Sequence, residues 1–600
     1  MNLKWQRVEA VVIGMLMSSS MVLQAAVLSN DVVEVRARRL IMPGRSDSVV
    51  ASLERDPRVA LNRQGGTDVQ SDISIRGSSF SEAGLILEGM ALRNPQTEHF
   101  NAELPLPSVI FADPVVATGM EQVERGTTHP AGGIAVVSQD PRSGGYIDLG
   151  LGQQGSAWQA GWIERLLQES DEGRIGVGGF GYHEEATAVD YPDNDMERAG
   201  GGATFKSRQG PWSSDLMVGA SHKEFGARGY YGVSPKWAAL EDVDDVMVLG
   251  VVRRGDLDGP YRRVTGLWRS LEDHYLLFID PAKPFENRHR SRMSGVTVDG
   301  REELNETWSW LWRAAFSYEG VNGALGEHDR ERNTVLLMPR WQGDDLRVSA
   351  GVTGEIFSDG DGVVLPHVGV EWQVGRHQEL FASYTEAMHE PSYTELNYDS
   401  PGSLGNAGLE KGRSRKSECG WRSQPTRGPA TSVSLFHRET ENAVDWIKLT
   451  EETARWTATD LGTVSTWGVE CSAAQRLGEN FRLRTGYTWI EKEHDWDVYA
   501  SRYVLDYAQH RLSLDLDWQL AESWRLSVGQ TLYHHSETEA READASGVDG
   551  RLALQWYAPR PDGMVVRIGV DNLWNDSFGS YVDLPAPDRR VWAAASWRFF

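Results

Sequence analysis

The feature that most constrains this chain is the strict alternation of apolar and polar residues in its C-terminal third. In the segment RLSLDLDWQL (511–520), every second residue from Leu512 to Leu520 is large and apolar, and the residues between them are polar. The segments 481–490, 550–557 and 565–570 repeat the pattern. Because successive side chains of a strand point to opposite faces, each segment is expected to form a β-strand with one apolar face. A slip of one residue would turn every large apolar side chain to the wrong side, at roughly 1.5–3 kcal/mol each.

The connections between these segments alternate in length. Residues 521–523 and 559–563 are tight turns, whereas 491–507, 536–547 and 575–588 are long and polar. Strands of about ten residues with long loops at one end only are typical of an outer-membrane β-barrel. A soluble sandwich gives no reason for one-sided loops, and a propeller would need an internal repeat of roughly 40–50 residues, which the chain lacks.

The size of this region predicts the number of strands. Residues 145–600 provide about 21 residues for each strand and its connection if the barrel has 22 strands, which suits strands of about ten residues. A 16-stranded barrel would have about 28 residues for each strand and connection, which implies longer loops than the C-terminal third contains. The side chains of so wide a barrel cannot fill its lumen, so the preceding residues are expected to fill it. The predicted fold is therefore an all-β membrane protein, a 22-stranded antiparallel transmembrane β-barrel around a globular α+β plug domain.

The N-terminus and the composition limit the class of protein further. Lys4 and Arg7 precede an apolar run that ends in small residues near Ala25, as in a secretory signal. No later stretch has the roughly 18 apolar residues of a spanning helix. A formal charge of −26 argues against a nucleic-acid partner. The chain contains no Gly-x-Ser-x-Gly, phosphate-binding or His-Glu-x-x-His motif, so we expect no enzyme activity and no catalytic residues.

The segment before the barrel resembles the plug of TonB-dependent outer-membrane transporters. The plug motifs occur in the family's order, and further matching motifs follow through the barrel. Their wording is most similar to the cobalamin-transporter branch. The matching words are DISIRG (72–77), LEGMALRNPQT (87–97), EQVERG (121–126), GGIAVVS (132–138), FGARGYYG (225–232), FENRHRS (285–291), the segment 384–414, WGVE (467–470) and YVLDYAQHRLSL (503–514).

The resemblance implies a function and a set of domains. The chain is expected to import a scarce large ligand, cobalamin-like or a ferric siderophore, through the bacterial outer membrane into the periplasm. Its expected partners are a TonB-type inner-membrane energy transducer, outer-membrane lipid and lipopolysaccharide, and the small-molecule ligand. We expect a monomer without a cofactor. The implied domains are a signal peptide (1–25), the TonB box with the plug (26–140) and the barrel (141–600).

The segment DVVEV resembles the TonB box, which the transducer binds as an added β-strand. It comprises Asp31, Val32, Val33, Glu34 and Val35. An ordinary plug strand is the other interpretation of this segment, because Glu34 and Arg36 depart from the family's wording. The alternative function is therefore a plugged outer-membrane binding receptor that is not coupled to TonB.

The resemblance also assigns residues to the ligand and to the contact between plug and barrel. The expected ligand-binding residues mix hydrogen-bonding groups with aromatic rings: Arg93, Asn94, Gln96, Thr97, His99, Phe100, Asn101, Tyr384, His389, Tyr393 and Tyr398. The expected ion cluster joins plug arginines to wall glutamates: Arg76, Arg125, Glu418 and Glu470. Arginine suits this role because its planar fork binds carboxylate in two places.

Two further predictions concern cysteines and metals. If Glu418 and Glu470 point inward, alternation turns Cys419 and Cys471 outward to lipid, with one strand between them. Their backbones should then be about 9–10 Å apart, too far for a disulfide. The acidic runs 241–245 and 358–362 could attract calcium, but acidic loops are usually only solvated, so no metal site is assigned.

Overall fold

The computed structural model describes residues 49–599 except 51, 54–55, 65–68, 188–190, 192, 497, 537–540, 542–543, 560–562, 580, 582–583 and 585–586. The predicted signal peptide and TonB box lie outside the described residues.

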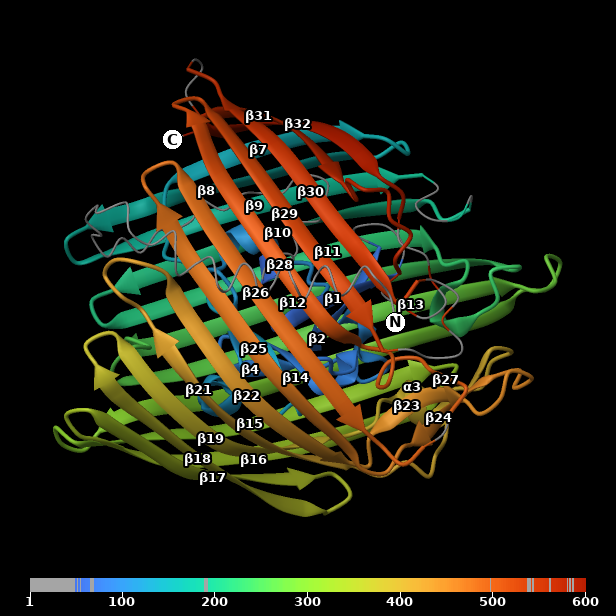
Figure 1. Ribbon diagram of the computed structural model, residues 1–600, viewed down its shortest axis with the longest axis horizontal. Coiled ribbons are helices and arrows are strands. Elements are labelled where there is room, and N and C mark those ends of the chain that lie inside the picture. The colour runs from blue at the N-terminus through green and yellow to red at the C-terminus, as the bar shows by residue number, and fades with distance from the viewer. Residues whose placement is uncertain are drawn as a thin grey trace, which may run out of the picture.

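Within the described residues, a single antiparallel sheet of 22 strands closes on itself, as the sequence predicts. Consecutive strands pair with one another, and the last pairs with the first (Figure 1). The strands are β7 (Gly144–Gly152), β8 (Ala157–Ser170), β9 (Gly173–Ala186), β10 (Met196–Gln209), β11 (Trp212–Gly226), β12 (Ala238–Gly255), β13 (Tyr261–Phe278), β14 (Phe285–Glu303), β15 (Trp308–Gly323), β16 (Gly326–Gln342), β17 (Leu346–Phe357), β18 (Gly362–Gly375), β19 (Gln378–His389), β21 (Gly412–Ser423), β22 (Ala430–Glu441), β25 (Val464–Leu477), β26 (Phe481–Glu493), β28 (Ala508–Ala521), β29 (Trp524–His535), β30 (Ser546–Tyr557), β31 (Met564–Asp571) and β32 (Arg590–Phe599).

The barrel has a short-turn end and a long-loop end. Two-residue turns join β8 to β9, β10 to β11 and β28 to β29, whereas residues 390–411, 442–463 and 494–507 form loops at the opposite end. These loops carry the helix α3 (Tyr393–Asn397) and a small sheet in the order β20-β24-β23-β27. The sheet strands are β20 (Ser403–Leu404), β24 (Trp456–Asp460), β23 (Val444–Lys448) and β27 (Ala500–Ser501).

The outward face of the barrel is apolar. On β16, Val335 and Leu337 are about half exposed, while their neighbours Leu336 and Met338 are buried against the interior. On β32, Val591 and Trp597 are exposed to a similar degree. Such a contiguous apolar belt needs hydrocarbon rather than water as its solvent. Among the described residues, no helix is long and apolar enough to cross a membrane.

The plug fills the lumen and contains both strands and a helix. An antiparallel hairpin of β1 (Val59–Gln64) and β2 (Gln70–Ile75) precedes a mixed four-stranded sheet. The sheet order is β4-β3-β6-β5, and its core includes Leu85 and Ile134, both 0% exposed. Figure 1 shows these blue elements enclosed by the barrel strands. The remaining elements are β3 (Ala83–Leu87), β4 (Met90–Leu92), β5 (Val115–Ala117), β6 (Gly132–Val136), α2 (Gly119–Arg125) and the short 3₁₀ segments η2 (Phe80–Glu82), η3 (Glu98–Phe100) and η4 (Ser108–Ile110).

Candidate ligand cavity and plug–barrel interface

A cavity of about 90 Å³ lies between the plug and the long-loop end of the barrel. The plug contributes η3 and the residues before it, the wall contributes β12, β13 and β14, and the loops contribute α3, β23 and β24. Aromatic rings dominate its lining, together with neutral hydroxyl and amide groups and three carboxyl groups. The lining residues are Gln70, Phe80, Gln96, Thr97, His99, Phe100, Tyr231, Glu241, Asp273, Tyr275, Asn287, His289, Ser392, Thr394, Glu395, Tyr398, Ser403, Trp446, Trp456, Arg502 and Tyr503.

His99 is held in place on the plug side of this cavity. Its Nδ1 lies 2.8 Å from the carboxylate of Asp72 on β2, and its ring stacks on Phe80 with centroids 3.9 Å apart. The ring of Tyr503, from a long loop, meets both of these rings edge-on. The contact with Asp72 therefore connects the cavity directly to the β1–β2 hairpin.

The plug loop between β4 and η3 is shaped by its own side chains. Asn94 Oδ1 accepts hydrogen bonds from the backbone N–H groups of Gln96 (3.0 Å) and Thr97 (3.4 Å). Asn101 Oδ1 accepts one from Asn94 N–H (2.8 Å), and Arg93 forms an ion pair with Glu98 (2.8 Å). Burial raises the pKa of the Glu98 carboxyl even though Arg93 opposes the shift.

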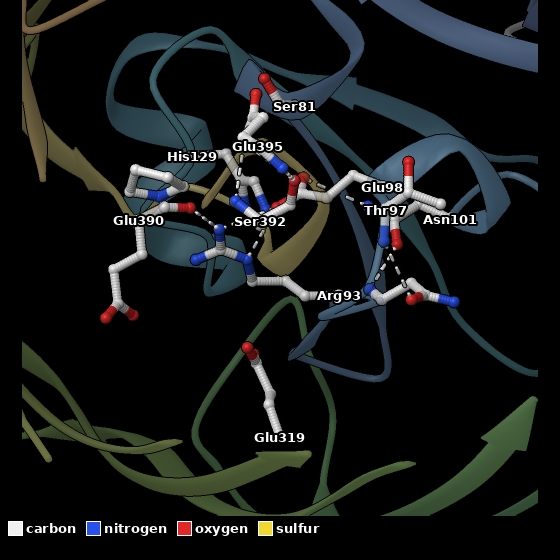
Figure 2. Close-up of polar contacts among 12 residues, drawn as sticks. Ser81, Arg93, Thr97, Glu98, Asn101, His129, Glu319, Glu390, Ser392 and Glu395 are labelled. Atoms are coloured by element: carbon white, nitrogen blue, oxygen red, sulfur yellow. Dashed lines mark hydrogen bonds and ion pairs between the residues drawn. The ribbon is translucent and has the colours of Figure 1, made fainter. Parts of the chain in front are cut away.

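Backbone hydrogen bonds attach the loop 390–411 to the plug. Tyr393 N–H donates to the Pro95 carbonyl (2.9 Å), and Thr394 N–H donates to the Gln96 carbonyl (3.0 Å). Arg93 adds a bond from its guanidinium to the Glu390 carbonyl (3.2 Å), which Figure 2 shows. The cavity is therefore covered by a loop that is bonded to the plug beneath it.

Glu395 fixes the start of α3. Its carboxyl group accepts bonds from the N–H (2.7 Å) and hydroxyl (2.9 Å) of Ser392, whose hydroxyl in turn accepts from Glu395 N–H. This reciprocal arrangement is a capping box. Burial raises the pKa of Glu395 to about 7.

The structure divides the predicted ligand residues into three groups. Gln96, Thr97, His99, Phe100 and Tyr398 line the cavity. Arg93, Asn94 and Asn101 lie behind it and hold the plug loop in shape. Tyr384, His389 and Tyr393 are not among the described lining residues.

The structure explains why Tyr384, His389 and Tyr393 do not line the cavity. Ser383 pairs with Glu418, whose side chain points into the lumen, so alternation turns Tyr384 outward, where its hydroxyl donates to Glu386. Tyr393 instead stacks on His328, with ring centroids 5.1 Å apart. His389 is buried at the end of β19, outside the cavity lining.

Several lining residues were missed although they lie in the family-like words. Tyr231 belongs to FGARGYYG, Asn287 and His289 belong to FENRHRS, and Tyr503 opens YVLDYAQHRLSL. The occurrence of these residues in family-like segments was the sequence signal that could have identified them as lining residues. Glu241, Asp273, Trp446 and Trp456 lie in stretches without such wording, so only the folded arrangement brings them to the cavity.

Arg76 connects the plug to the barrel wall as predicted. Its guanidinium lies 2.8 Å from the carboxylate of Glu418 and 2.9 Å from that of Glu470, and it stacks over the Phe436 ring. The side chain of Arg76 is only 6% exposed. Both carboxylates strengthen its positive charge and raise its pKa although burial acts in the opposite direction.

The placement of Arg125 in this cluster was wrong. Arg125 ends α2 and pairs with Glu121 one turn earlier at 2.9 Å, with both side chains more than a third exposed. The second arginine of the cluster is Arg58, which lies 3.9 Å from Glu470 and 2.8 Å from Asp56. Helical spacing explains the error, because an acidic residue four positions away gives Arg125 a local partner.

A second ion cluster contacts the plug at Glu88, directly after β3. Asp299 on β14 binds Arg263 (2.9 Å) and Arg313 (3.2 Å), and Arg263 reaches Glu88 of the plug (3.4 Å). Arg313 also donates to the carbonyls of Val123 and Glu124 in α2. Cationic groups at a helix C-terminus satisfy carbonyls that have no partner within the helix.

The acidic runs do not form calcium cages. In 241–245, alternation sends Glu241 and Asp245 inward and leaves Asp242 and Asp244 outside beside His222. That exterior group is the one set of metal-ligand side chains found among the described residues. In the run 358–362, Asp359 and Asp361 both pair with Lys411. None of these observations assigns a metal.

The two cysteines are free and separated by one strand, as predicted. Cys419 on β21 is opposite Leu435 of β22, and Cys471 on β25 is opposite Val433 of the same strand. Cys419 is exposed and Cys471 is half-buried. Because β22 lies between them, they cannot form a disulfide without rearranging the barrel.

Comparisons with known proteins agree with this architecture. The family model "TonB dependent receptor-like, beta-barrel" matches residues 146–573. A curated relative, the vitamin B12 transporter BtuB of Vibrio vulnificus (strain CMCP6), is 20% identical over 94% of this chain and 92% of the relative.

Solved structures with the same fold include iron and siderophore receptors. The FrpB iron transporter of Neisseria meningitidis (F3-3 variant) gives a TM-score of 0.71 at 12% identity, covering 92% of this chain and 96% of that one. The siderophore receptor PirA of Pseudomonas aeruginosa gives 0.70 at 13% identity, covering 93% and 97%. With a family model that matches most of its length and a closed, plugged 22-strand barrel, this chain belongs to the TonB-dependent receptor family of outer-membrane transporters.

Proposed function

We propose that this protein imports a scarce ligand, a cobalamin or a ferric siderophore, into the periplasm with energy supplied through a TonB-type transducer. The observation that carries the proposal is the cavity built jointly by plug and long loops at the extracellular end. A site shared by both parts changes when the plug moves, so ligand binding and plug displacement can be coupled. The proposed domains are a signal peptide (1–25), the TonB box and plug (26–140) and the barrel (141–600).

The small volume of the cavity makes loop opening part of the proposed mechanism. A cavity of about 90 Å³ is far smaller than a typical site for a drug-sized ligand, at about 300–1,000 Å³. Binding therefore requires the loop 390–411 to break its backbone bonds to Pro95 and Gln96. Once released, the plug loop is free to move with the ligand.

The contact between His99 and Asp72 gives a route from the ligand to the periplasmic side. Asp72 lies on β2, whose end carries Arg76 and the Glu418–Glu470 cluster. The paired strand β1 begins at Val59, next to Arg58 of the same cluster. A displacement of His99 is thus transmitted to the ion cluster and to the chain that leads back to the proposed TonB box.

The curated relative and the structural neighbours suggest different ligands. The BtuB relative is a vitamin B12 transporter and aligns over nearly the whole chain, which supports cobalamin as the first candidate. The solved structures include the ferric enterobactin receptor PfeA (TM-score 0.72, 12% identity), which keeps ferric siderophores second. Equilibrium binding of cyanocobalamin and of a siderophore panel to the purified protein decides between them.

Energy coupling is tested by changing residues 31–35. Deletion of Asp31–Val35 should abolish uptake by whole cells while ligand binding to the purified protein is retained. Val33→Pro should do the same because proline removes a donor from an added strand, whereas Val33→Ala should leave uptake intact. Unchanged uptake after the deletion would instead support the second candidate, a plugged binding receptor that is not coupled to TonB.

The outer surface supports the proposed lipopolysaccharide partner. Arg288, Arg290 and Arg292 follow one another on the exposed face of β14, directly above the outward-facing Val296. Arg290 pairs with Glu272, whereas Arg288 and Arg292 have no carboxylate partner among the described residues. Ten positions separate Arg292 from Glu302, which pairs with Arg262, and a strand of about that length spans the hydrocarbon layer. This spacing supports a position of the arginines at the height of the lipid headgroups.

A further inference from the structure

Four buried polar atoms of the cavity have no hydrogen-bond partner among the described residues. They are Gln70 Nε2, Asp273 Oδ1, Tyr275 Oη and His289 Nε2. All four residues line the cavity, and each is at most 6% exposed. Burying a polar atom without a partner is unfavourable, because the hydrogen bonds that it loses to water are not replaced. A cluster of such atoms around one cavity is expected where a ligand supplies the missing partners.

The charges beside these atoms are predominantly negative. Glu241 and Asp273, on the adjacent strands β12 and β13, are 3% and 5% exposed, and they lie on the same inward face because their register positions differ by two residues. Glu241 also accepts a bond from the Tyr231 hydroxyl (2.6 Å), and Asp273 accepts one from the Gln96 side chain. Both carboxyl groups belong to the cavity lining.

Positive charge does not balance this pair within the cavity. Among the described lining residues, Arg502 is the one arginine, there is no lysine, and Glu395 adds a third carboxyl group. Arg502 stacks over Trp456 and Tyr503 and donates to the Tyr503 hydroxyl (3.0 Å). Lys223 is attracted to Glu241, but its ammonium group is bonded to the Val69 carbonyl and to Glu103.

We propose that Glu241 and Asp273 form a subsite for a positively charged nitrogen group of the transported ligand. An ammonium group brings donors to Asp273 Oδ1 and Tyr275 Oη, which have no partner among the described residues, and its charge opposes that of the two carboxyl groups. The neighbouring rings of Tyr231, Tyr275 and Tyr398 favour a cation over their faces. The inference rests on the proposed function only in placing the ligand in this cavity.

This subsite favours the ferric siderophores over a cobalamin, which carries no ammonium group, and it divides the siderophores by their charge. A polyanionic ferric catecholate would bring negative charge against two buried carboxyl groups, near which the described lining offers Arg502 and the His289 ring, 3.7 Å from Asp273. Like charges in a buried site repel strongly. A ligand that carries an amine, such as a hydroxamate siderophore with a free ammonium group, satisfies the site. The structure therefore assigns the cavity to cationic rather than anionic ligands.

The test uses two small probes that share a ring and differ in charge, 2-phenylethylammonium and phenylacetate. Each is titrated into the purified full-length protein in detergent, and binding is followed by tryptophan fluorescence, because Trp446 and Trp456 line the cavity. We expect the ammonium probe to bind at least tenfold more tightly than the carboxylate probe. Equal affinities, tighter binding of phenylacetate, or no binding of either probe would overturn the proposal.

Substitutions test whether Glu241 and Asp273 cause the preference for the ammonium probe. Glu241→Gln and Asp273→Asn should each remove most of the preference for the ammonium probe. Asp244→Asn is the matched control, because it removes the same charge from the outer face of β12 and should leave the preference unchanged. A loss of preference in the control, or its persistence in both cavity variants, would refute the subsite.

A larger probe pair connects the subsite to transport. Ferrioxamine B carries a free ammonium group, and its N-acetylated form does not. Weaker binding of the acetylated form by at least tenfold supports the subsite, and equal binding contradicts it. Whole-cell uptake reports separately on the proposed function, since a protein that discriminates the probes but imports neither would retain the subsite and lose the transporter.

Discussion

The Nε atom of Arg76 lies 2.9 Å from a carboxylate oxygen of Glu470, although 394 positions separate the two residues in the chain. This contact and the one to Glu418 join the plug to the wall through charges that are almost fully buried. Arg76→Ala should therefore weaken the attachment of the plug by about 3–5 kcal/mol, because it leaves two buried carboxylates without their main partner. Hydrogen exchange of β1 and β2 should accelerate by at least a hundredfold.

Arg125→Ala is the control for this variant. Its ion pair with Glu121 is exposed and lies within one helical turn, so its loss should cost at most about 0.5 kcal/mol. Plug exchange that responds equally to both variants would show that the cluster of Arg76, Glu418 and Glu470 does not hold the plug.

The pH dependence of the loop over the cavity follows from Glu395. Its pKa of about 7 in the folded protein exceeds the ordinary value of 4.5, so the folded loop retains a proton that the unfolded loop releases. The stability from this proton is complete below about pH 4.5 and is lost as the pH rises through 7. Opening of residues 392–405 should become easier between pH 5 and pH 8.

Glu395→Gln should abolish that dependence, because glutamine can accept the Ser392 bonds without a charge. Hydrogen exchange of wild type and variant is compared at each pH, so that the intrinsic rate cancels. We expect similar protection of the loop at pH 5 and at least tenfold more protection in the variant at pH 8. Equal protection at both values would contradict the role of this carboxyl group.

Charge on the lipid face should destabilise the barrel according to its height. Leu337 lies outward near the middle of β16, and Glu327 lies outward beside its hairpin with β15. Leu337→Arg should lower the free energy of unfolding in vesicles by about 2–4 kcal/mol, and Glu327→Arg by about 0–1 kcal/mol. Urea titrations monitored by fluorescence measure both, and equal costs would mean that bilayer does not cover Leu337.

The arginine row on β14 should retain phosphorylated lipid through purification. The double variant Arg288→Glu and Arg292→Glu should lose about 1 kcal/mol of lipid binding for each arginine, measured as lipid A content by mass spectrometry. The control is the double variant Arg254→Glu and Arg262→Glu, which makes the same charge change at the opposite rim of the barrel. A lipid A content that falls equally in both double variants would contradict a specific site on β14.

Alternation was enough to predict the barrel because a strand in lipid needs an apolar side chain at every second residue. Leu512 to Leu520 satisfy it on sequence alone, and the Arg76 cluster followed from the resemblance. The cavity could not be predicted in the same way, since Glu241, Asp273 and Trp456 come from three separate segments. Arg125 failed for a related reason: sequence words identify an arginine, but only its neighbours in the fold decide which carboxylate it binds.

The pairing of β7 with β32 has a consequence for biogenesis. The strand that completes the ring follows the other barrel strands in the chain, and the plug precedes all of them. The barrel must therefore close around a plug that already lies between its strands, or the plug must enter the closed barrel through the periplasmic opening. In assembly intermediates that lack β32, the edge of β7 should be unpaired and accessible to periplasmic proteases and chaperones.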